Sequence, residues 1–431
     1  MRKYIEPERS IWSEIVARPS SDRPEIQSRV RNILSRVKNG GDKSLRSLAY
    51  EIDGIELSSL EVSPGEFAEA DKLVPYSLKN ALKTAASNIW KFHKEQMPGT
   101  LEVETMPGVK CFRKAVPINK AGLYIPGGTA PLFSTVLMLA IPASIAGCRE
   151  IVMCTPCGKD GKVHPSVLYA ARLCGVGRVF KIGGAQAVGA MAYGTGTVPK
   201  VDKIFGPGNR YVAEAKRIVS GEGVAVDMFA GPSEVLVMAD NSSVPEYVAA
   251  DLLSQAEHGC DSQVCLLVDN EELAERIEAS LRAQLRLLPR KETADEALNG
   301  SISVVLHSRG EMVEFANAYA PEHLIISMVD PWGIAWKVNA AGSVFIGNYS
   351  PESAGDYASG TNHTLPTSGT ASASGGIGVD SFTHYVTYQE ISRNGLASLS
   401  DAIIEMAVAE GLDAHANAVA IRMEGLSDKT D

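Results

Sequence analysis

Short runs of β-branched and apolar residues recur through the middle of the chain, and helix-like stretches separate several of them. We interpret as strands the runs at residues 150–153, 178–182, 203–205, 234–238, 264–268, 303–306, 324–328 and 343–346. Helix-like stretches between them include residues 212–219, 272–288 and 311–320. This alternation predicts an α/β fold with a mostly parallel sheet. Because the runs spread over about 200 residues, we expect two sheets rather than one.

The two ends of the chain have a more helical pattern. Residues 23–38 and 76–96 are amphipathic with helical periodicity. Near the C-terminus, residues 398–410 and 413–423 predict two short helices that Gly411 separates. We therefore expect small helical pieces at both ends of an α/β protein.

Composition excludes several classes of protein. The chain has 431 residues, of which 45% are hydrophobic and 21% charged, so two or three ordinary folded domains are expected. The net charge is 41 − 51 = −10. Phosphate contacts need clustered Lys and Arg, which argues against a nucleic-acid partner. The longest apolar run, 134–148, is shorter than the about 18 residues of a membrane span, and the first residues do not form a signal peptide. We expect a cytoplasmic protein.

The seven cysteines are odd in number and scattered, which argues against a disulfide framework. Cys154 and Cys157 form a C-x-x-C pair directly after a predicted strand, but no second pair at zinc-finger spacing accompanies them. We interpret the pair as packing residues rather than as a redox or zinc site.

A first group of polar residues lies at the end of a predicted helix. Ser243 and Glu246 have the spacing of a capping box at its start. Gln255 and His258 are three residues apart, and Asp251 shares their helical face. An imidazole and an amide oxygen could both face a cation, although Gln is an uncommon zinc ligand. The alternative is a histidine that caps the last carbonyls of the helix.

A second group is Glu322 and His323, where a predicted helix meets a predicted strand. A carboxylate and an imidazole could serve as water activator and general base. Neighbouring side chains of an extended backbone point to opposite faces, so convergence on one site needs a turn, which Pro321 could supply. A solvated Glu beside a capping His explains the pattern equally well.

Two further candidates lie toward the C-terminus. Residues 347–381 are dense in Gly, Ser, Thr and Pro, and loops beyond about 12–15 residues are usually functional or disordered. Asp356 and His363 lie in this segment and offer ligands that suit zinc, although Asp also makes turns. Glu410 and His415 flank Gly411 and could face one pocket, but a lone His near a chain end is more often exposed and inert.

Three glycine-rich segments follow predicted strands or form turns, at residues 122–128, 183–189 and 206–209. The segment 183–189 opens a helix, which suits a phosphate at a helix N-terminus. No G-x-G-x-x-G, P-loop, H-E-x-x-H or G-x-S-x-G motif is present. Each glycine segment is also consistent with a tight turn, so these residues alone do not predict a dinucleotide cofactor.

Six segments together resemble the histidinol dehydrogenase family. They are GLYIPGG (122–128), KIFGPGN (203–209), AGPSEVL (230–236), LLSQAEHG (252–259), PEHL (321–324) and SPESAGDYASGTNH (350–363). Their order and spacing over nearly the whole chain carry the resemblance, because no single motif does.

The resemblance implies a set of roles for individual residues. The zinc ligands it implies are Gln255, His258, Asp356 and His415, one Zn²⁺ per subunit, with His415 supplied by the partner subunit of an obligate homodimer. The catalytic residues it implies are Glu322 and His323. The substrate contacts it implies are Ser233, His323, Glu410 and the zinc ligands, with His363 close by. The NAD contacts it implies are Tyr124, Gln186 and Asn209.

The implied reaction is a zinc-dependent, four-electron oxidation of L-histidinol to L-histidine through bound L-histidinaldehyde, using two NAD. This is the last step of histidine biosynthesis. One rival is a sister zinc and NAD enzyme for another alcohol, such as a sulfonated diol, although an acidic Glu410 suits a cationic amino alcohol better. A second rival is a non-catalytic zinc-binding or ligand-sensing protein, which the presence of both Glu322 and His323 disfavours.

The implied architecture is two incomplete Rossmann-like domains, one inserted in the other, in an intertwined homodimer. Within it, residues 1–22 pack with the C-terminal region. The main domain comprises residues 23–123 and 232–377, and residues 124–231 form the inserted NAD-binding domain. Residues 378–402 form a small dimerisation segment. Residues 403–431 form a helical piece that supplies Glu410 and His415 to the partner.

Overall fold

The computed structural model describes residues 1–18, 24–127, 130–229 and 231–427. The predicted boundary at 22 and 23, Gly128 and Ala230 of the motifs, and the last residues of the predicted 403–431 piece lie outside the described residues. The chain divides into two compact units. Unit 1 comprises Met1–Gln96 and Ile118–Phe382, and unit 2 comprises Met97–Pro117 and Thr383–Asp431.

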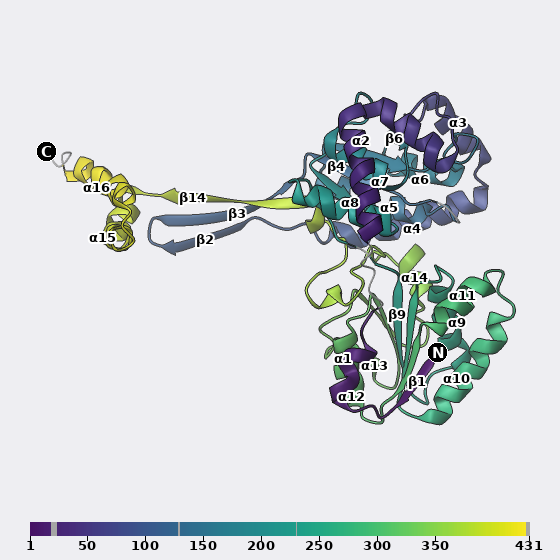
Figure 1. Ribbon diagram of the computed structural model, residues 1–431. Coiled ribbons are helices and arrows are strands. Elements are labelled where there is room, and N and C mark those ends of the chain that lie inside the picture. The colour runs from purple at the N-terminus through teal and green to yellow at the C-terminus, as the bar shows by residue number, and fades with distance from the viewer. Residues whose placement is uncertain (19–23, 128–129, 230, 428–431) are drawn as a thin grey trace. The chain divides into compact units, whose positions relative to one another are not determined.

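The first sheet of unit 1 has five parallel strands (Figure 1). They are β4 (Lys120–Tyr124), β5 (Glu150–Thr155), β6 (Arg178–Lys181), β7 (Lys203–Phe205) and β8 (Ala225–Val226). Their order is β6-β5-β4-β7-β8. The chain therefore starts at the centre, moves to one edge, and returns to fill the other. In such doubly wound sheets ligands bind beyond the carboxyl ends of the strands, beside the point where the order reverses.

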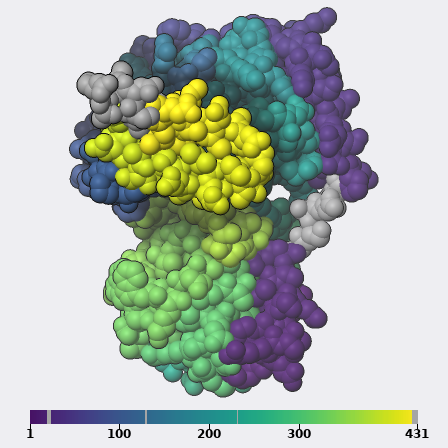
Figure 2. Space-filling model, turned by 90° about the vertical axis from the view of Figure 1, so that its left-hand side faces the viewer, coloured from purple at the N-terminus to yellow at the C-terminus, as the bar shows by residue number. Residues whose placement is uncertain are grey.

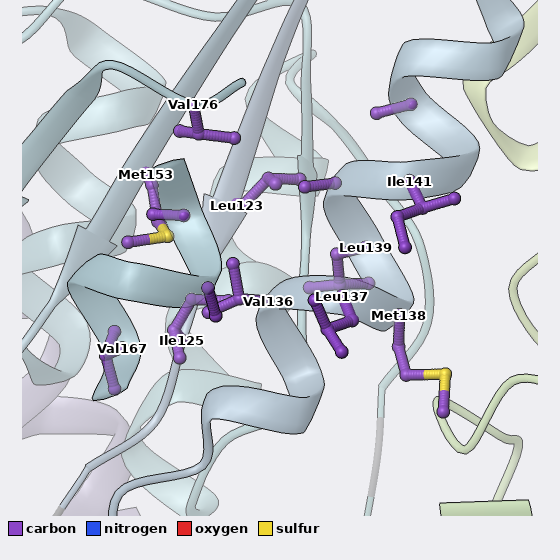
Figure 3. Packing of buried hydrophobic residues seen from close by; sticks show 14 of the residues in the cluster. Leu123, Ile125, Val136, Leu137, Met138, Leu139, Ile141, Met153, Val167 and Val176 are labelled. Atoms are coloured by element: carbon purple, nitrogen blue, oxygen red, sulfur yellow. The ribbon is translucent and has the colours of Figure 1, made fainter. Parts of the chain in front are cut away.

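Helices cover both faces of this sheet, and the strand residues alternate between them. One face packs against α3 (Pro64–Leu73), α4 (Tyr76–Lys94), α5 (Phe133–Ala146) and α6 (Pro165–Leu173). The other packs against α2 (Pro24–Leu48), η2 (Ala49–Asp53), α7 (Gly184–Tyr193) and α8 (Arg210–Gly221). Figure 3 shows Leu123 and Met153 from the strands beside Val136 and Leu137 of α5. Because both faces of the sheet are buried, the strands are mostly apolar and do not alternate between apolar and polar residues.

The second sheet of unit 1 has six parallel strands (Figure 1). They are β1 (Arg2–Ile5), β9 (Glu234–Ala239), β10 (Gln263–Val268), β11 (Ile302–Val305), β12 (His323–Ser327) and β13 (Ser343–Ile346). The order β1-β11-β10-β9-β12-β13 repeats the winding of the first sheet, with β1 added at one edge.

Helices also cover both faces of this second sheet. One face packs against α9 (Pro245–Ala256), α10 (Glu271–Leu285) and α11 (Lys291–Asn299), and the other against α1 (Trp12–Ile15), α12 (Arg309–Tyr319) and α13 (Pro331–Ala335). The N-terminal residues, including η1 (Arg9–Ile11), lie beside the later segments of this sheet, as the purple and green surfaces in the lower part of Figure 2 show. A segment from the start of the chain thus belongs to the same core as residues 234–346.

The segment that follows β13 is folded rather than structureless. It contains α14 (Glu352–Tyr357), η3 (Thr370–Ser372) and η4 (Asp380–Phe382). Its turns are held partly by side chains, since the Asn362 amide donates to Met138 O at 2.6 Å and its oxygen accepts from Thr364 N at 2.9 Å.

Unit 2 consists of a three-stranded antiparallel sheet and two helices. The sheet has the order β14-β3-β2, with β2 (Leu101–Met106), β3 (Val109–Pro117) and β14 (Thr383–Ile391). The helices α15 (Arg393–Ala409) and α16 (Asp413–Ser427) pack against each other. None of the hydrophobic clusters among the described residues includes a residue of this unit.

The predicted α/β class with mostly parallel sheets is confirmed, and so is the expectation of two such sheets. The predicted ends of the helices were less accurate. The predicted helix 23–38 continues to Leu48, with a change of direction at Gly41, whose φ is 51°. The predicted capping box is wrong: α9 starts at Pro245, its N-cap is Val244, and the Ser243 hydroxyl is buried without a hydrogen-bond partner among the described residues. In the described part of the chain, no helix is both long and apolar enough to span a membrane.

Candidate active site

Glu322 and His323 stand at the start of β12, directly after a tight turn. Ala320 ends α12 in the left-handed conformation, with φ of 48°, and Pro321 follows it. This turn brings the two neighbouring side chains together, with 3.7 Å between Glu322 Oε2 and His323 Nδ1. Both also bond to the backbone of Glu234, the first residue of β9.

The hydrogen bond of His323 determines which ring nitrogen carries the proton. Nδ1 lies 3.1 Å from the carbonyl oxygen of Glu234, and a carbonyl can only accept, so Nδ1 is protonated and donates. Burial lowers the pKa of His323 to about 3, which keeps the ring neutral. Nε2 therefore has a free lone pair, and among the described residues it has no hydrogen-bond partner.

Two carboxylates of α14 face this ring. Asp356 Oδ1 lies 3.7 Å from His323 Nε2, and Glu352 Oε1 lies 3.7 Å from Nδ1. Glu352 and Asp356 are four residues apart on one helix, so their side chains share a face. The Gln255 amide, with its nitrogen toward Glu352, donates to that carboxylate, and its oxygen accepts from Glu234 N at 3.2 Å.

The cluster is acidic and buried. Burial raises the pKa of Asp356 and of Asp251 to about 7. Burial and the neighbouring carboxylates raise the pKa of Glu352 well above its usual value, and the same causes act on Glu322 despite its bond from Glu234 N. Carboxylates that repel each other in a low-dielectric site are stabilised by a cation placed among them.

The donor set fits a borderline metal such as zinc. Ligand atoms of His323, Glu352 and Asp356 all lie within 4.8 Å of one another. Imidazole and carboxylate are both accepted zinc ligands. A cation held among these carboxylates would relieve their mutual repulsion.

The predicted zinc ligands are brought together only in part. Gln255 and Asp356 lie in this cluster, and His258 lies close enough to act electrostatically on His323. His258 follows the end of α9, where its N–H donates to Gln255 O at 3.2 Å. His415 lies in α16 of unit 2, where its side chain is exposed.

The other three predicted substrate contacts, Ser233, His363 and Glu410, lie in different parts of the fold. Ser233 is half-buried directly before β9, and its carbonyl accepts from Gln263 N at 3.0 Å. His363 Nδ1 donates to Asp356 O at 3.0 Å, and its Nε2 lies 3.3 Å from Thr135 Oγ1. Glu410 is the exposed C-cap of α15 in unit 2.

Glu352 is a site residue that the sequence did not identify beyond its place in the polar segment 347–381. The spacing of Glu352 and Asp356 is the signal that could have found it, because residues four apart share a helical face. The segment has the composition of a loop, and six residues of α14 are too few to show a periodicity.

A cleft of about 740 Å³ lies at the carboxyl ends of strands of the five-stranded sheet. Tyr124, Gln186 and Asn209, the predicted NAD contacts, all line it. Tyr124 ends β4, and its hydroxyl accepts from Gly184 N at 3.1 Å. Burial raises the pKa of Tyr124 to about 12, so the phenol stays neutral and can hydrogen-bond a ligand. The cleft has the size and position of a dinucleotide site in a doubly wound sheet.

Asn209 is held by the loop that follows β7. Its side chain caps α8, accepting from Tyr211 N at 3.0 Å and Val212 N at 3.2 Å. Earlier in the loop, Gly206 has φ of 120° and packs so closely against Tyr124 O that a Cβ would collide with it. The loop is therefore restricted to one path beside the cleft.

The buried Lys216–Asp227 ion pair holds Gly206 from the other side. Lys216 Nζ donates to Gly206 O at 3.0 Å, and Asp227 Oδ2 accepts from Gly206 N at 2.7 Å. Both backbone polar groups of Gly206 are thus satisfied by a pair of charges that also neutralise each other.

A solved structure of an NAD-dependent aldehyde dehydrogenase from Sinorhizobium meliloti has a TM-score of 0.50 at 13% identity, covering 85% of this chain and 87% of that one, which shows a shared fold alone. Residues 16–423 match the family model described as histidinol dehydrogenase.

Individual relatives agree with the family model. Histidinol dehydrogenase of Bacteroides fragilis (strain YCH46) is 54% identical over 97% of this chain and 98% of its own. That of Escherichia coli (strain K12) is 49% identical over 96% of both. A crystal structure of histidinol dehydrogenase from Elizabethkingia anophelis has a TM-score of 0.97 at 48% identity and covers 99% of both chains.

The protein is an oxidoreductase with an α/β fold. More particularly, the chain belongs to the histidinol dehydrogenase family. The resemblance seen in the sequence motifs is therefore confirmed.

Proposed function

We propose that the protein oxidises L-histidinol to L-histidine through bound L-histidinaldehyde, with zinc and two NAD, as the last step of histidine biosynthesis. The observation that carries the proposal is the neutral His323, which has Glu322 beside its Nδ1 and keeps a free Nε2 lone pair beside Asp356. A general base needs a free lone pair of this kind, within reach of the proton that it removes.

The proposed zinc ligands are Gln255, His258 and Asp356, with His415 of the partner subunit. When bound, zinc orients the amine and imidazole nitrogens of the substrate, and NAD accepts the hydride. The carboxylates of Glu352, which is buried, and of Asp251 and Asp356, which are half-buried, support a cationic occupant, because burial raises the pKa of each.

His323 removes the alcohol proton at Nε2 as the hydride leaves, while Nδ1 keeps its bond to Glu234 O. Glu322 then takes a proton from water as that water adds to the bound aldehyde. The carboxylate form of Glu322, which Glu234 N holds through a hydrogen bond, is the group that accepts this proton. After it has released its first proton to solvent, His323 acts again as the base when the hydrated aldehyde loses the second hydride, and the closed site protects the aldehyde from release.

Substrate contacts from Ser233, His363, Glu410 and the zinc ligands complete the proposed site, and Tyr124, Gln186 and Asn209 bind NAD in the cleft. The acidic cluster favours a cationic amino alcohol over a sulfonated diol, since a sulfonate would add negative charge to a site that already concentrates it.

A homodimer is part of the proposal, and the surface of unit 2 supports it. Its sheet and helices leave large apolar side chains exposed in the single chain: Leu101, Val103, Tyr385, Tyr388, Ile391, Met406, Val408, Leu412 and Ile421. Exposed apolar area on this scale marks an interface with another chain. A second copy that covers this surface could also bring the exposed Glu410 and His415 to a site in the first.

The experiment is a count of NADH formed from limiting histidinol and excess NAD by the zinc-loaded enzyme. We expect two NADH for each histidinol, and none from dihydroxypropanesulfonate. A yield of one NADH, or reduction of NAD by the sulfonate alone, contradicts the proposal.

A further inference from the structure

The backbone of one residue holds both Glu322 and His323. The N–H of Glu234 donates to Glu322 Oε2 at 2.9 Å, and the carbonyl of Glu234 accepts from His323 Nδ1 at 3.1 Å. The position of this residue therefore sets the direction of the Glu322 carboxylate and the tautomer of His323. A shift of Glu234 would move both groups together.

The side chain of Glu234 is itself fixed by a buried ion pair. Its carboxylate is 1% exposed and is held by the Arg18 guanidinium, with Nε at 3.0 Å from Oε1 and Nη2 at 2.8 Å from Oε2. Ser368 N adds a third hydrogen bond to Oε1 at 3.0 Å. Two parallel bonds from a planar guanidinium define both the distance and the angle of the carboxylate.

Arg18 also holds the turn that leads to the catalytic pair. Its Nη2 donates to Tyr319 O at 2.7 Å, and its guanidinium stacks on the Tyr319 ring at 3.6 Å from the centroid. Tyr319 is the last residue of α12, three positions before Glu322. A further bond from Nη1 to Val16 O at 2.7 Å orients the guanidinium from its other side.

We propose that Arg18 is a positioning residue for Glu322 and His323, acting through Glu234 and Tyr319. This inference rests on the proposed function, because it assigns a task to the groups that the reaction uses. Arg18 joins the first residue of β9 to the last residue of α12, so that the two segments bearing the catalytic pair and its backbone partner keep one relative position. The N-terminal segment thus contributes to the chemistry without touching substrate.

The test compares two Arg18 variants with a control at the other end of α12. Arg18→Met removes both the charge and the hydrogen-bond donors of the guanidinium. Arg18→Lys keeps the charge, but it cannot form the two parallel bonds to Glu234 together with the bond to Tyr319 O. The control is Arg309→Met. Arg309 Nη2 pairs with Asp240 Oδ2 at 3.1 Å, and Asp240 directly follows the far end of β9.

We expect kcat to fall at least about 10-fold in Arg18→Met, because a base displaced by even 1 Å loses much of its effect. Arg18→Lys should retain an intermediate kcat, and KM for NAD should stay within about twofold in both, since the cleft belongs to the other sheet. Arg309→Met should keep the wild-type kcat, although it too removes an arginine–carboxylate pair.

Wild-type kcat in Arg18→Lys, or in a folded Arg18→Met, would overturn the inference. An equal loss of kcat in Arg309→Met would do the same, because the effect would then follow from general destabilisation. Arg18→Lys keeps the buried carboxylate paired, so the test remains decisive even where Arg18→Met does not fold. The proposed function is tested separately, by the NADH count of the wild-type enzyme.

Discussion

His323 combines three properties that a base in a closed site needs: a fixed tautomer, a neutral ring and a free nitrogen. The Glu234 carbonyl fixes the tautomer, and burial keeps the ring neutral by lowering its pKa to about 3. The same carbonyl would stabilise the ring when it becomes protonated during turnover, because Nδ1 remains a donor.

Replacement of His323 by Asn tests this role. The shorter amide can still donate to the Glu234 carbonyl, but it offers no basic nitrogen to the substrate. We expect kcat to fall at least about 100-fold, the usual contribution of a general base, with the fold and NAD binding preserved. Steady-state kinetics and thermal unfolding measure the two effects, and a variant with wild-type turnover would assign the base elsewhere.

The sequence predicted some residues of this site better than others. The carboxylate and the imidazole beside Pro321 made Glu322 and His323 candidates, and the family resemblance gave them catalytic roles. Glu352 was noted only as one polar residue of the segment 347–381 and was given no role, because that segment has the composition of a loop. Arg18 and Glu234 could not have been paired by spacing, since they lie far apart in the chain and meet only through the packing of the N-terminal segment on the second sheet.

At the scale of elements, the cleft depends on the loop between β7 and α8. Lys216 and Asp227 hold Gly206, which contacts Tyr124 and precedes Asn209. These contacts connect an ion pair outside the cleft to two residues that line it.

Replacement of Lys216 by Met should therefore weaken both stability and NAD binding. Breaking a buried pair from one side costs about 3–5 kcal/mol, because the remaining charge has no partner. We expect a loss of that size in denaturant unfolding and a raised KM for NAD. The control is Lys38→Met, whose pair with Glu222 is largely exposed and should change stability by less than about 1 kcal/mol. Equal effects in the two variants would contradict this account of the loop.

Asp42, beside the change of direction in α2, gives the fold a defined response to acid. Burial alone would raise its pKa, but hydrogen bonds from Thr195 and Thr197 and the charge of Arg46 outweigh that effect and lower it. The folded-state pKa is below the unfolded value of about 3.9, so Asp42 stabilises the fold above that pH and loses this contribution as the pH falls through the folded pKa.

Comparison with Asp42→Asn tests whether the stabilising contribution of Asp42 falls as the pH falls. The melting temperature of the wild type should exceed that of the variant at neutral pH, and the difference should shrink below about pH 4. Melting curves of both proteins between neutral and acidic pH measure it. A difference that grows as the pH falls would mean that the protonated carboxyl, and not the carboxylate, is the stabilising form.

Strands such as β9 and β10 were predicted because their apolar runs are long and buried, whereas the central strand β4 was not, because residues 122–128 were interpreted as a turn. The strands of unit 2 were not predicted, because the exposed residues of β2 and β14 lack the apolar pattern of a core strand. β1 was missed for a related reason: it lies at a sheet edge and exposes most of its side chains. Pairing with distant segments, rather than local pattern, makes these residues strands.

At the scale of the whole molecule, the two sheets of unit 1 have the same winding, but their candidate sites lie at opposite ends of the strands. The cleft lies at the carboxyl ends of β4 and its neighbours, whereas the acidic cluster gathers at the amino ends of β9 and β12. At the carboxyl end of β9, Asp240 accepts hydrogen bonds from Val329 N and Ser242 N.

The proposed exchange of His415 between subunits can be tested by mixing two inactive variants. If His415 acts in the partner's site, subunit exchange between the His323→Asn and His415→Ala variants gives heterodimers with two different sites. One site then contains both substitutions, and the other contains neither. Random exchange in a twofold dimer should then restore about a quarter of wild-type activity. No recovery, despite heterodimers detected by mass spectrometry, would show that His415 acts within its own chain or not at all.

The distance from His323 Nε2 to the alcohol oxygen of L-histidinol, in a crystal structure of the zinc-loaded protein, tests the central claim most directly. The account predicts a hydrogen bond of about 2.6–3.2 Å at that atom, with Nδ1 still donating to the Glu234 carbonyl. An imidazole turned away from the alcohol, or a different side chain in contact with its oxygen, would contradict the assignment of His323 as the base.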